Sequence, residues 1–385
     1  MTKSFREAYS IAQKELRSNY GKLGIYAAGP GRHHDYWARD SFITSLGSCS
    51  SRDFGRVRKN LELCTKFQLA DGHIPARIEE QSHLLAVIGI IRRHKEIRAL
   101  HKQTQPWAAD VVDSNSWYLI SACNYINVAS DSAWLRKNIK FLKRAADWLI
   151  EQLRLNGLVY EGPTANWSDC NLRTGYMIYN NVLAWKAIND LGELLDDKGK
   201  IYISISQRLK DNIIGRFWDE SLGYFIARID SAGKMHKYFY SDGNLLAIWF
   251  GLVDKNKGFR ILEFIDRHSL NEVPVPTGYP SLDKWNNLIN KTLFPYYATK
   301  NTFPWWGCVL ALARKKTGDT SKAQIELEKV AAQIVEYGTC HEVLTPDGKP
   351  VNLWFYKSEK RISWTAGMFI YTCHELGLVR NHKKI

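Results

Sequence analysis

The sequence predicts an all-α fold in which helical hairpins close into a toroid, with short β-hairpins in the loops. Apolar residues recur at three- and four-residue intervals along most of the chain, which is the period of an amphipathic helix. No linker rich in Pro, Gly and Ser divides the 385 residues. We therefore expect one large domain over residues 1–385, although single cores usually stop growing at roughly 250–300 residues.

About a dozen helices follow from this periodicity. The run from Leu245 to Phe250 is apolar nearly all round, as expected for a helix enclosed by other helices. Strand signals are confined to residues 158–160 and 224–227, and residues 218–225 are typical of a helix end, a turn and a short strand. The predicted helices span residues 5–16, 40–46, 57–69, 84–93, 116–126, 134–153, 179–194, 201–217, 245–252, 259–265, 305–313, 323–335 and 364–376.

The formal net charge of +14 raises the question of a nucleic-acid partner. The basic residues are dispersed, and no recognised nucleic-acid motif accompanies them. A solvated basic surface therefore explains the charge better than a phosphate-binding track, and we expect no nucleic-acid partner. The sequence carries no signal for an oligomeric state.

Cysteine usage and the amino terminus indicate the compartment. The seven cysteines form no Cys-x-x-Cys pair and no zinc-type quartet. The first residues are charged where a signal peptide would be apolar, and the longest apolar stretch, residues 84–91, is too short to span a bilayer. We expect a soluble cytoplasmic protein with reduced thiols and no membrane partner.

Three carboxylates lie near tryptophan in segments that are predicted loops or helix starts. Asp40 follows Trp37, Asp169 follows Trp167, and Glu342 precedes the helix that contains Trp364. An indole packs on the apolar face of a sugar ring, while carboxylates bind its hydroxyl groups and transfer protons at its glycosidic oxygen. With 14 Trp in the chain, the pattern predicts a carbohydrate substrate.

Each carboxylate also has an ordinary structural explanation. Asp169 is a candidate general acid whose pKa Trp167 would raise, but loop aspartates most often cap helices or turns. Glu342, which precedes a Pro-Asp-Gly turn, is a candidate base or a surface glutamate. Arg39 and Asp40 either bind sugar hydroxyls or form a structural ion pair.

Further polar and aromatic residues open predicted helices. Asp113 and Asp242 begin apolar helices, where capping and pocket lining are both open explanations. Trp305 and Trp306 are adjacent at another helix start, where they serve either the core or a sugar site. The histidines do not combine with carboxylates at metal-ligand spacing, and neither a Gly-rich phosphate loop nor a Gly-x-Ser-x-Gly elbow is present. We expect no metal and no cofactor.

The order of these motifs resembles a known family. Trp37-Ala38-Arg39-Asp40-Ser41-Phe42-Ile43 resembles the Trp-x-x-Gly-Arg-Asp-Thr-x-Ile segment of the amylo-alpha-1,6-glucosidase domain of glycogen-debranching enzymes. Residues 71–75, 113–114, 167–169 and 362–365 are similar to later motifs of that family, and residues 218–225 to a segment of six-hairpin glycosidases. Ala38 and Ser168 depart from the pattern, so related processing α-glucosidases and mannosylglycerate hydrolases remain open.

The resemblance implies an (α/α)6 barrel and an inverting exo-glycosidase that removes a terminal α-linked sugar, with glucose as the first expectation. It implies Asp169 as general acid and Glu342 as general base, with the two carboxyl groups roughly 6.5–9.5 Å apart. The alternatives are a sugar epimerase or isomerase that uses histidines, and a non-catalytic basic barrel that binds glycans or nucleic acid. The expected sugar-contacting residues are Trp37, Arg39, Asp40, Asp113, Trp167, Asp242, Trp305, Trp306 and Trp364.

Overall fold

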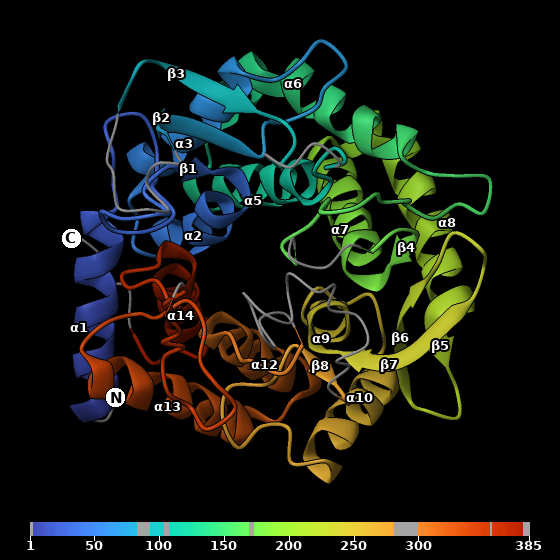
Figure 1. The fold of residues 1–385 in the computed structure, drawn as a ribbon. Coiled ribbons are helices and arrows are strands. Elements are labelled where there is room, and N and C mark those ends of the chain that lie inside the picture. Colours follow the sequence, from blue (N-terminus) through green and yellow to red (C-terminus); the bar gives the residue numbers. More distant parts are fainter. Residues whose placement is uncertain are drawn as a thin grey trace.

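Two concentric rings of helices form the molecule (Figure 1). The computed structural model describes residues 3–82, 93–103, 108–168, 173–280, 299–354 and 356–379. Within these residues the inner ring has six helices: α2 (Ala38–Ser50), α5 (Asp113–Ala129), α7 (Ile178–Leu194), α9 (Ser241–Trp249), α12 (Pro304–Thr317) and α14 (Ser363–Glu375). The outer ring of the same residues has α1 (Lys3–Ser18), α3 (Phe54–Lys66), α6 (Ser132–Glu151), α8 (Lys200–Phe217), α10 (Lys255–Arg267) and α13 (Thr320–Tyr337).

The alternation of inner and outer helices follows from their residue patterns. Every residue of α2 from Ala38 to Cys49 is buried, and the other inner helices are buried nearly all round. The outer helices α1, α6 and α10 instead bury one apolar stripe and leave charged residues in solvent. A helix that is apolar on all sides needs neighbours on all sides, so it occupies the inner ring.

The inner ring closes where α14 packs against α2. A Cβ atom on Gly47 of α2 would overlap the backbone carbonyl of Gly367 in α14, and one on Gly367 would lie 2.7 Å from the Cα of Thr44. The two glycines therefore permit the close approach of these backbones. The first helix, α1, packs against α13 and α14 and covers this seam from outside.

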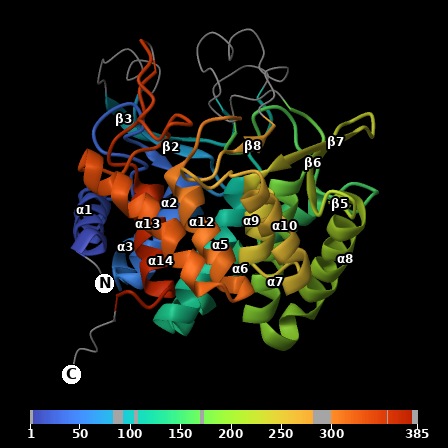
Figure 2. The same ribbon diagram turned by 90° about the horizontal axis from the view of Figure 1, so that it is seen from below.

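The two ends of the toroid differ in the length of their connections. Five of the inner helices, α2, α5, α7, α9 and α12, each join the following outer helix through a short segment: residues 51–53, 130–131, 195–199, 250–254 and 318–319. The longer segments, including 19–37, 152–177, 218–240 and 338–362, run from an outer helix back to the next inner helix. We call these the short-link end and the loop end. All inner helices thus begin at the loop end (Figure 2).

Small antiparallel sheets occupy the loop end, above the helices (Figure 2). One sheet has the order β1-β2-β3 and the other β4-β6-β7-β8, with β5 paired to β6. Their bounds are β1 (Tyr36–Trp37), β2 (Arg77–Gln81), β3 (Arg93–Leu100), β4 (Tyr176–Met177), β5 (Trp218–Asp219), β6 (Tyr224–Ile229), β7 (Met235–Tyr240) and β8 (Gly278–Tyr279).

The predicted helices are confirmed except the one at residues 84–93, which lies almost wholly outside the described residues; Arg93 itself begins β3. The turn and strand expected at 218–225 are confirmed, since Trp218 pairs with Phe225. The strand expected at 158–160 is wrong, because Val159 makes only an isolated bridge to Leu153. In the part of the chain that the structure describes, no helix combines the length and hydropathy needed to cross a membrane.

Candidate active site

The first turns of the inner helices bring polar residues together at the loop end. Arg39 and Asp40 lie in the first turn of α2, Asp113 begins α5, and Asp242 is the second residue of α9. Carboxylates are stabilised at helix N-termini by the helix dipole and by backbone N–H groups that lack helical partners. All four side chains are buried. The fold therefore collects charged groups at one end of the inner ring.

Arg39 joins the aspartates of two helices. Its Nη1 donates to Oδ2 of Asp113 at 3.2 Å, and its Nη2 lies 3.6 Å from Oδ2 of Asp40. Tyr179 of α7 also donates to Oδ2 of Asp113, at 3.4 Å, and Trp117 donates to the Tyr179 hydroxyl at 3.1 Å. The predicted grouping of Arg39, Asp40 and Asp113 is thus present in space.

Burial sets the protonation of these aspartates. It raises the pKa of Asp40 from 3.8 to about 7, opposed by the Arg39 guanidinium and reinforced by the charge of Glu342. Burial likewise raises the pKa of Asp113, and Arg39 again opposes the shift. The influence of Glu342 on Asp40 shows that these two carboxyl groups, from opposite ends of the chain, belong to one electrostatic cluster.

Glu342 is held in one orientation by groups from two loops. Its side chain is 1% exposed. Its Oε2 accepts hydrogen bonds from the Tyr356 hydroxyl at 2.9 Å and from the Glu359 backbone N–H at 3.3 Å. Nη2 of Arg32 lies 3.8 Å from the same oxygen, and the Arg32 guanidinium covers the Tyr356 ring at 4.6 Å. Hydrogen-bond donors and a cation around one oxygen suit an ionised carboxylate.

Tryptophans from three segments form a contiguous aromatic cluster. The rings of Trp305 and Trp306 at the start of α12 have centroids 3.7 Å apart, and Trp364 of α14 stacks on Trp305 at 5.6 Å. Trp167 contacts Trp306 at 5.8 Å, and its Nε1 donates to Oδ2 of Asp242 at 3.0 Å. The backbone N–H of Trp167 also bonds to Asp113. The aromatic cluster and the buried aspartates are therefore adjacent.

Several buried polar atoms of this cluster have no hydrogen-bond partner among the described residues. They are Oδ2 of Asp40, Oδ1 of Asp113, and Nε1 of Trp305, Trp306 and Trp364. Buried polar atoms are nearly always paired in folded proteins, with protein or with bound molecules. The set contains both acceptors and donors, so it suits a ligand that offers both, such as a polyhydroxylated ring.

Trp37 and Asp169 stand apart from this cluster for different reasons. Trp37 packs against His33, with ring centroids 5.6 Å apart, and against the Arg77 guanidinium at 4.6 Å. It therefore lies beside β2, two residues before Arg39. Asp169 lies outside the described residues. Its neighbour Ser168 donates its backbone N–H to Oδ1 of Asn166 at 2.8 Å.

Glu161 is a buried carboxyl group that the sequence did not single out. It accepts from Nδ2 of Asn166 at 2.6 Å and from Nδ2 of Asn180. Burial raises its pKa to about 8, against the attraction of Arg173. Glu161 thus anchors the loop that leads to Asp169. Glu161 could have been identified from the sequence because it is a carboxylate in the same predicted loop as Trp167. Arg32 and Tyr356, also missed, had no local signal because their importance depends on contact with Glu342.

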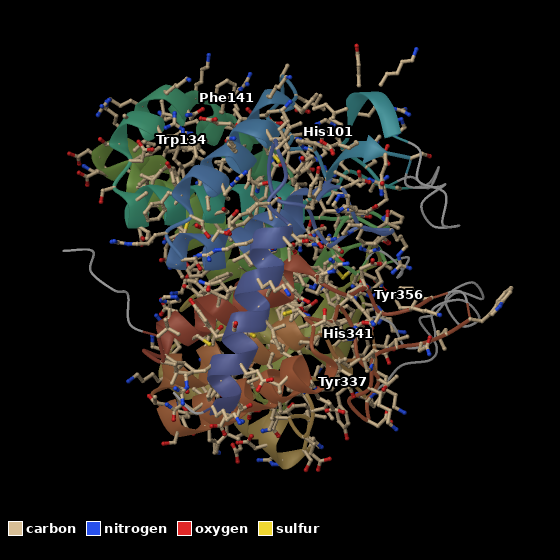
Figure 3. The ribbon with its side chains drawn as sticks, turned by 90° about the vertical axis from the view of Figure 1, so that its left-hand side faces the viewer. His101, Trp134, Phe141, Tyr337, His341 and Tyr356 are labelled. Atoms are coloured by element: carbon tan, nitrogen blue, oxygen red, sulfur yellow. The ribbon has the colours of Figure 1, made fainter. Side chains whose placement is uncertain are left out.

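The histidine beside Glu342 faces away from the carboxylate cluster. The ring of His341 contacts Tyr337 of the outer helix α13, with centroids 5.6 Å apart, and both lie in the C-terminal part of the fold (Figure 3). Burial lowers the pKa of His341 to about 4, so this ring is neutral near pH 7. Within the described ranges, no cluster of three His, Cys, Asp or Glu side chains could hold a metal ion.

Comparison with known proteins identifies the fold. No protein-family model and no curated protein matches the sequence. Among solved structures, a rhamnosidase from Klebsiella oxytoca with rhamnose bound superposes with a TM-score of 0.71 at 13% identity, over 98% of this chain and 64% of that one. The chain therefore spans less than two thirds of that rhamnosidase.

Two further structures match over nearly their full length. A GH63 mannosylglycerate hydrolase from Thermus thermophilus in complex with glucose has a TM-score of 0.70 at 13% identity, over 94% of this chain and 99% of that one. A glycosidase variant in complex with glucose has a TM-score of 0.71 at 13% identity, over 99% and 100%. The chain has the six-hairpin (α/α)6 toroid fold that we expected, with small antiparallel sheets added.

Proposed function

We propose that this protein is an inverting glycoside hydrolase that removes a terminal α-linked sugar, with glucose as the first candidate. The carrying observation is the loop-end cluster of Asp40, Asp113, Trp305, Trp306 and Trp364. Its carboxylate oxygens and indole N–H groups include buried atoms without hydrogen-bond partners among the described residues. A sugar supplies hydroxyl groups for both and an apolar face for the rings. Rhamnose and glucose in the matching glycosidase structures support the same ligand class.

In the proposed reaction, Glu342 acts as the general base. It removes a proton from a water molecule, which attacks the anomeric carbon from the face opposite the leaving group. Tyr356 and Arg32 orient the carboxylate for this step and stabilise its charge before the proton arrives. Asp169 is the proposed acid that protonates the leaving oxygen, on the basis of motif order and its position after Trp167.

Arg39, Asp40 and Asp113 are proposed to bind the terminal sugar. Arg39 is always charged and would donate hydrogen bonds to sugar hydroxyls, while Asp113 would accept hydrogen bonds from them. The pKa of Asp40 is about 7, so near neutral pH this group exists in both forms and can either donate to or accept from a hydroxyl. The indole cluster of α12 and α14 would contact the apolar face of the ring. The buried free thiols of Cys49, Cys64 and other cysteines suit a reducing compartment, which supports a cytoplasmic location.

A panel of α-linked disaccharides, small α-glycosides such as mannosylglycerate, and glycogen limit dextrin tests this function. NMR spectra of the anomeric proton, recorded early in the reaction before mutarotation, should show that the released sugar has the inverted configuration. Limit dextrin as the best substrate would support an amylo-1,6-glucosidase. An isomerised product without cleavage would replace the hydrolase by an epimerase, and sugar binding without turnover would replace it by a binding protein.

Matched variants locate the chemistry. Glu342→Gln and Asp169→Asn should each lower kcat by at least about 10³-fold while the thermal unfolding temperature changes little. Glu359→Gln is the control for Glu342, because Glu359 shares the Arg32 contact at 3.6 Å but has no proposed chemical role. Its kcat should fall less than about tenfold. Substantial activity in Glu342→Gln would remove the assignment of the base.

A further inference from the structure

A second cavity opens at the short-link end, opposite the candidate active site. Its volume is about 380 Å³, within the range of roughly 300–1,000 Å³ typical of small-molecule sites. Its lining comes from the last turns of the inner helices and the residues that follow them, including Asn127 of α5, Asp190 of α7, Lys316 of α12 and Tyr371 of α14. We call it the basal cavity.

The same helices carry the candidate active site at their first turns. In α5, Asp113 lies at the start and Asn127 near the end, about 21 Å apart at a rise of about 1.5 Å per residue. Among the described residues, none that lines the basal cavity belongs to the loop-end cluster. The basal cavity is therefore a separate site rather than an extension of the loop-end cluster.

Half-buried aromatic rings form one wall of the basal cavity. The ring of Trp249 lies 4.5 Å from Phe250 and 5.8 Å from Tyr371, measured between centroids, and all three line the cavity. Trp249 is the last residue of α9, so its ring reaches the end of the toroid. Partly exposed aromatic faces offer contact to the apolar C–H face of a ligand ring.

The charged groups of the cavity balance one another. Lys186 Nζ lies 2.6 Å from Oδ1 of Asp190 and 5.6 Å from the Phe250 ring centroid. Lys316 and Glu193 add one charge of each sign to the lining. A lining of two ammonium and two carboxylate groups has no net charge, so it gives little preference to an anion or to a cation.

The remaining polar groups suit hydroxyls. Asn124 and Asn127 each present an amide oxygen that accepts and an amide NH₂ that donates. The carboxylates of Asp190 and Glu193 are further acceptors in the lining. A hydroxyl group can donate to these oxygens and accept from the amides and lysines at the same time.

We propose that the basal cavity binds a neutral sugar, of one or two rings, as a second carbohydrate site distinct from the candidate active site. Aromatic faces, paired amide donors and acceptors, and balanced charges together match a polyhydroxylated ring with an apolar face. The proposal does not depend on the proposed hydrolysis, since it concerns a different end of the molecule.

Calorimetric titration of the full chain with glucose and maltose tests the proposal. Asn127→Trp fills the cavity from an exposed position on α5. Val128→Trp is the matched control, because Val128 is 52% exposed and does not line the cavity. We expect a binding component that is weakened at least tenfold in Asn127→Trp and unchanged in Val128→Trp. Lys316→Trp fills the cavity from α12 and should give the same loss.

Other results would overturn the second site. Sugar binding that is equal in Asn127→Trp, Lys316→Trp and Val128→Trp would show that the basal cavity takes no sugar. Binding of inorganic phosphate or malate in preference to glucose would show that the ligand is an anion. Failure of the proposed function would look different. The unchanged protein would hydrolyse no glycoside, yet it would still show the sugar-binding component that Asn127→Trp weakens.

Discussion

Glu342 depends on residues that are far away in sequence. Arg32 comes from the loop before β1, and Tyr356 and Glu359 from the loop before α14. Each contact is made to the same oxygen, Oε2. The orientation of the proposed base is therefore a property of two loops that meet at the loop end.

Tyr356→Phe tests the orienting hydrogen bond to Glu342. The change removes the 2.9 Å donor while keeping the ring under Arg32. We expect kcat/KM to fall about tenfold, because one hydrogen bond to a charged group contributes about 1.5–3 kcal/mol and part of it is replaced by water. The fall should lie in kcat rather than in KM, which steady-state kinetics on the best substrate will measure.

Tyr337→Phe is the control for this prediction. The Tyr337 hydroxyl donates to the Gly348 carbonyl at 3.4 Å and does not contact Glu342. Its kcat should change less than about twofold. Equal losses in both variants would mean that the Tyr356 hydroxyl acts on the fold and not on the base.

Asp40 should make the protein less stable as the pH rises. Its pKa is 3.8 in an unfolded chain and about 7 in the fold, because of burial. Its contribution is therefore fully present below about pH 4 and is lost as the pH rises through 7. Asp40→Asn, which stays neutral, should exceed the wild type in stability by about 1–3 kcal/mol at pH 8 and match it at pH 4.

Thermal unfolding of both proteins at the two pH values measures this difference. The same substitution should lower activity, since the proposed sugar contact loses its charged form. A variant that is less stable than the wild type at pH 8 would show that the ion pair with Arg39, 3.6 Å away, outweighs the desolvation of Asp40.

At the scale of elements, periodicity predicted helices well and strands poorly. Helices are local, so the three- and four-residue apolar period of α1, α6 or α13 is visible without the rest of the fold. The strand β2, with the sequence Arg-Ile-Glu-Glu-Gln, has weak β-propensity and forms because β1 and β3 flank it. Such a strand is specified by its neighbours and not by its own residues.

Gly47→Ala tests the seam between α2 and α14. The added methyl would overlap the Gly367 backbone, which cannot move as a side chain can. We expect a loss of more than about 2 kcal/mol in the free energy of unfolding, measured with urea. Gly55→Ala on α3 is the control, since a Cβ there meets nothing within 4 Å. It should be neutral or slightly stabilising, and equal losses would contradict a tight seam.

For the whole molecule, buried carboxyl groups predict that stability falls as the pH rises from about 4 to 8. Burial raises the pKa of Asp35, Asp40 and Glu359 to about 7 and that of Glu161 to about 8. Their contributions are intact below about pH 4 and are lost as the pH rises through 7–8. Burial lowers the pKa of His73 and His341 from 6.5 to about 4. Their contribution to the stability of the fold is therefore lost as the pH falls from 6.5 to about 4.

The carboxyl groups and the histidines act in opposite directions, and together they predict how the stability of the fold depends on pH. Between about pH 4 and 6.5 the histidines offset part of the carboxyl effect, and above about pH 8 the carboxyl groups are ionised in both states and change the stability no further. The unfolding temperature should therefore fall most steeply between about pH 6 and 7 and level off above about pH 8, as differential scanning calorimetry will measure. A flat or rising curve between about pH 5 and 7 would mean that these carboxyl groups are ionised in the fold without cost.

By itself, the sequence determined a toroid of helical hairpins, because helical periodicity and helices that are apolar on all sides are local patterns. The resemblance to a glucosidase family added the six-hairpin form and the expectation that Arg39, Asp40 and Asp113 contact one sugar. The tertiary structure decided which residues hold Glu342, how Gly47 and Gly367 close the ring, and that the inner helices end around a second cavity. These features arise only when the ring closes, because they join side chains from distant segments whose own sequences carry no mark of the contact.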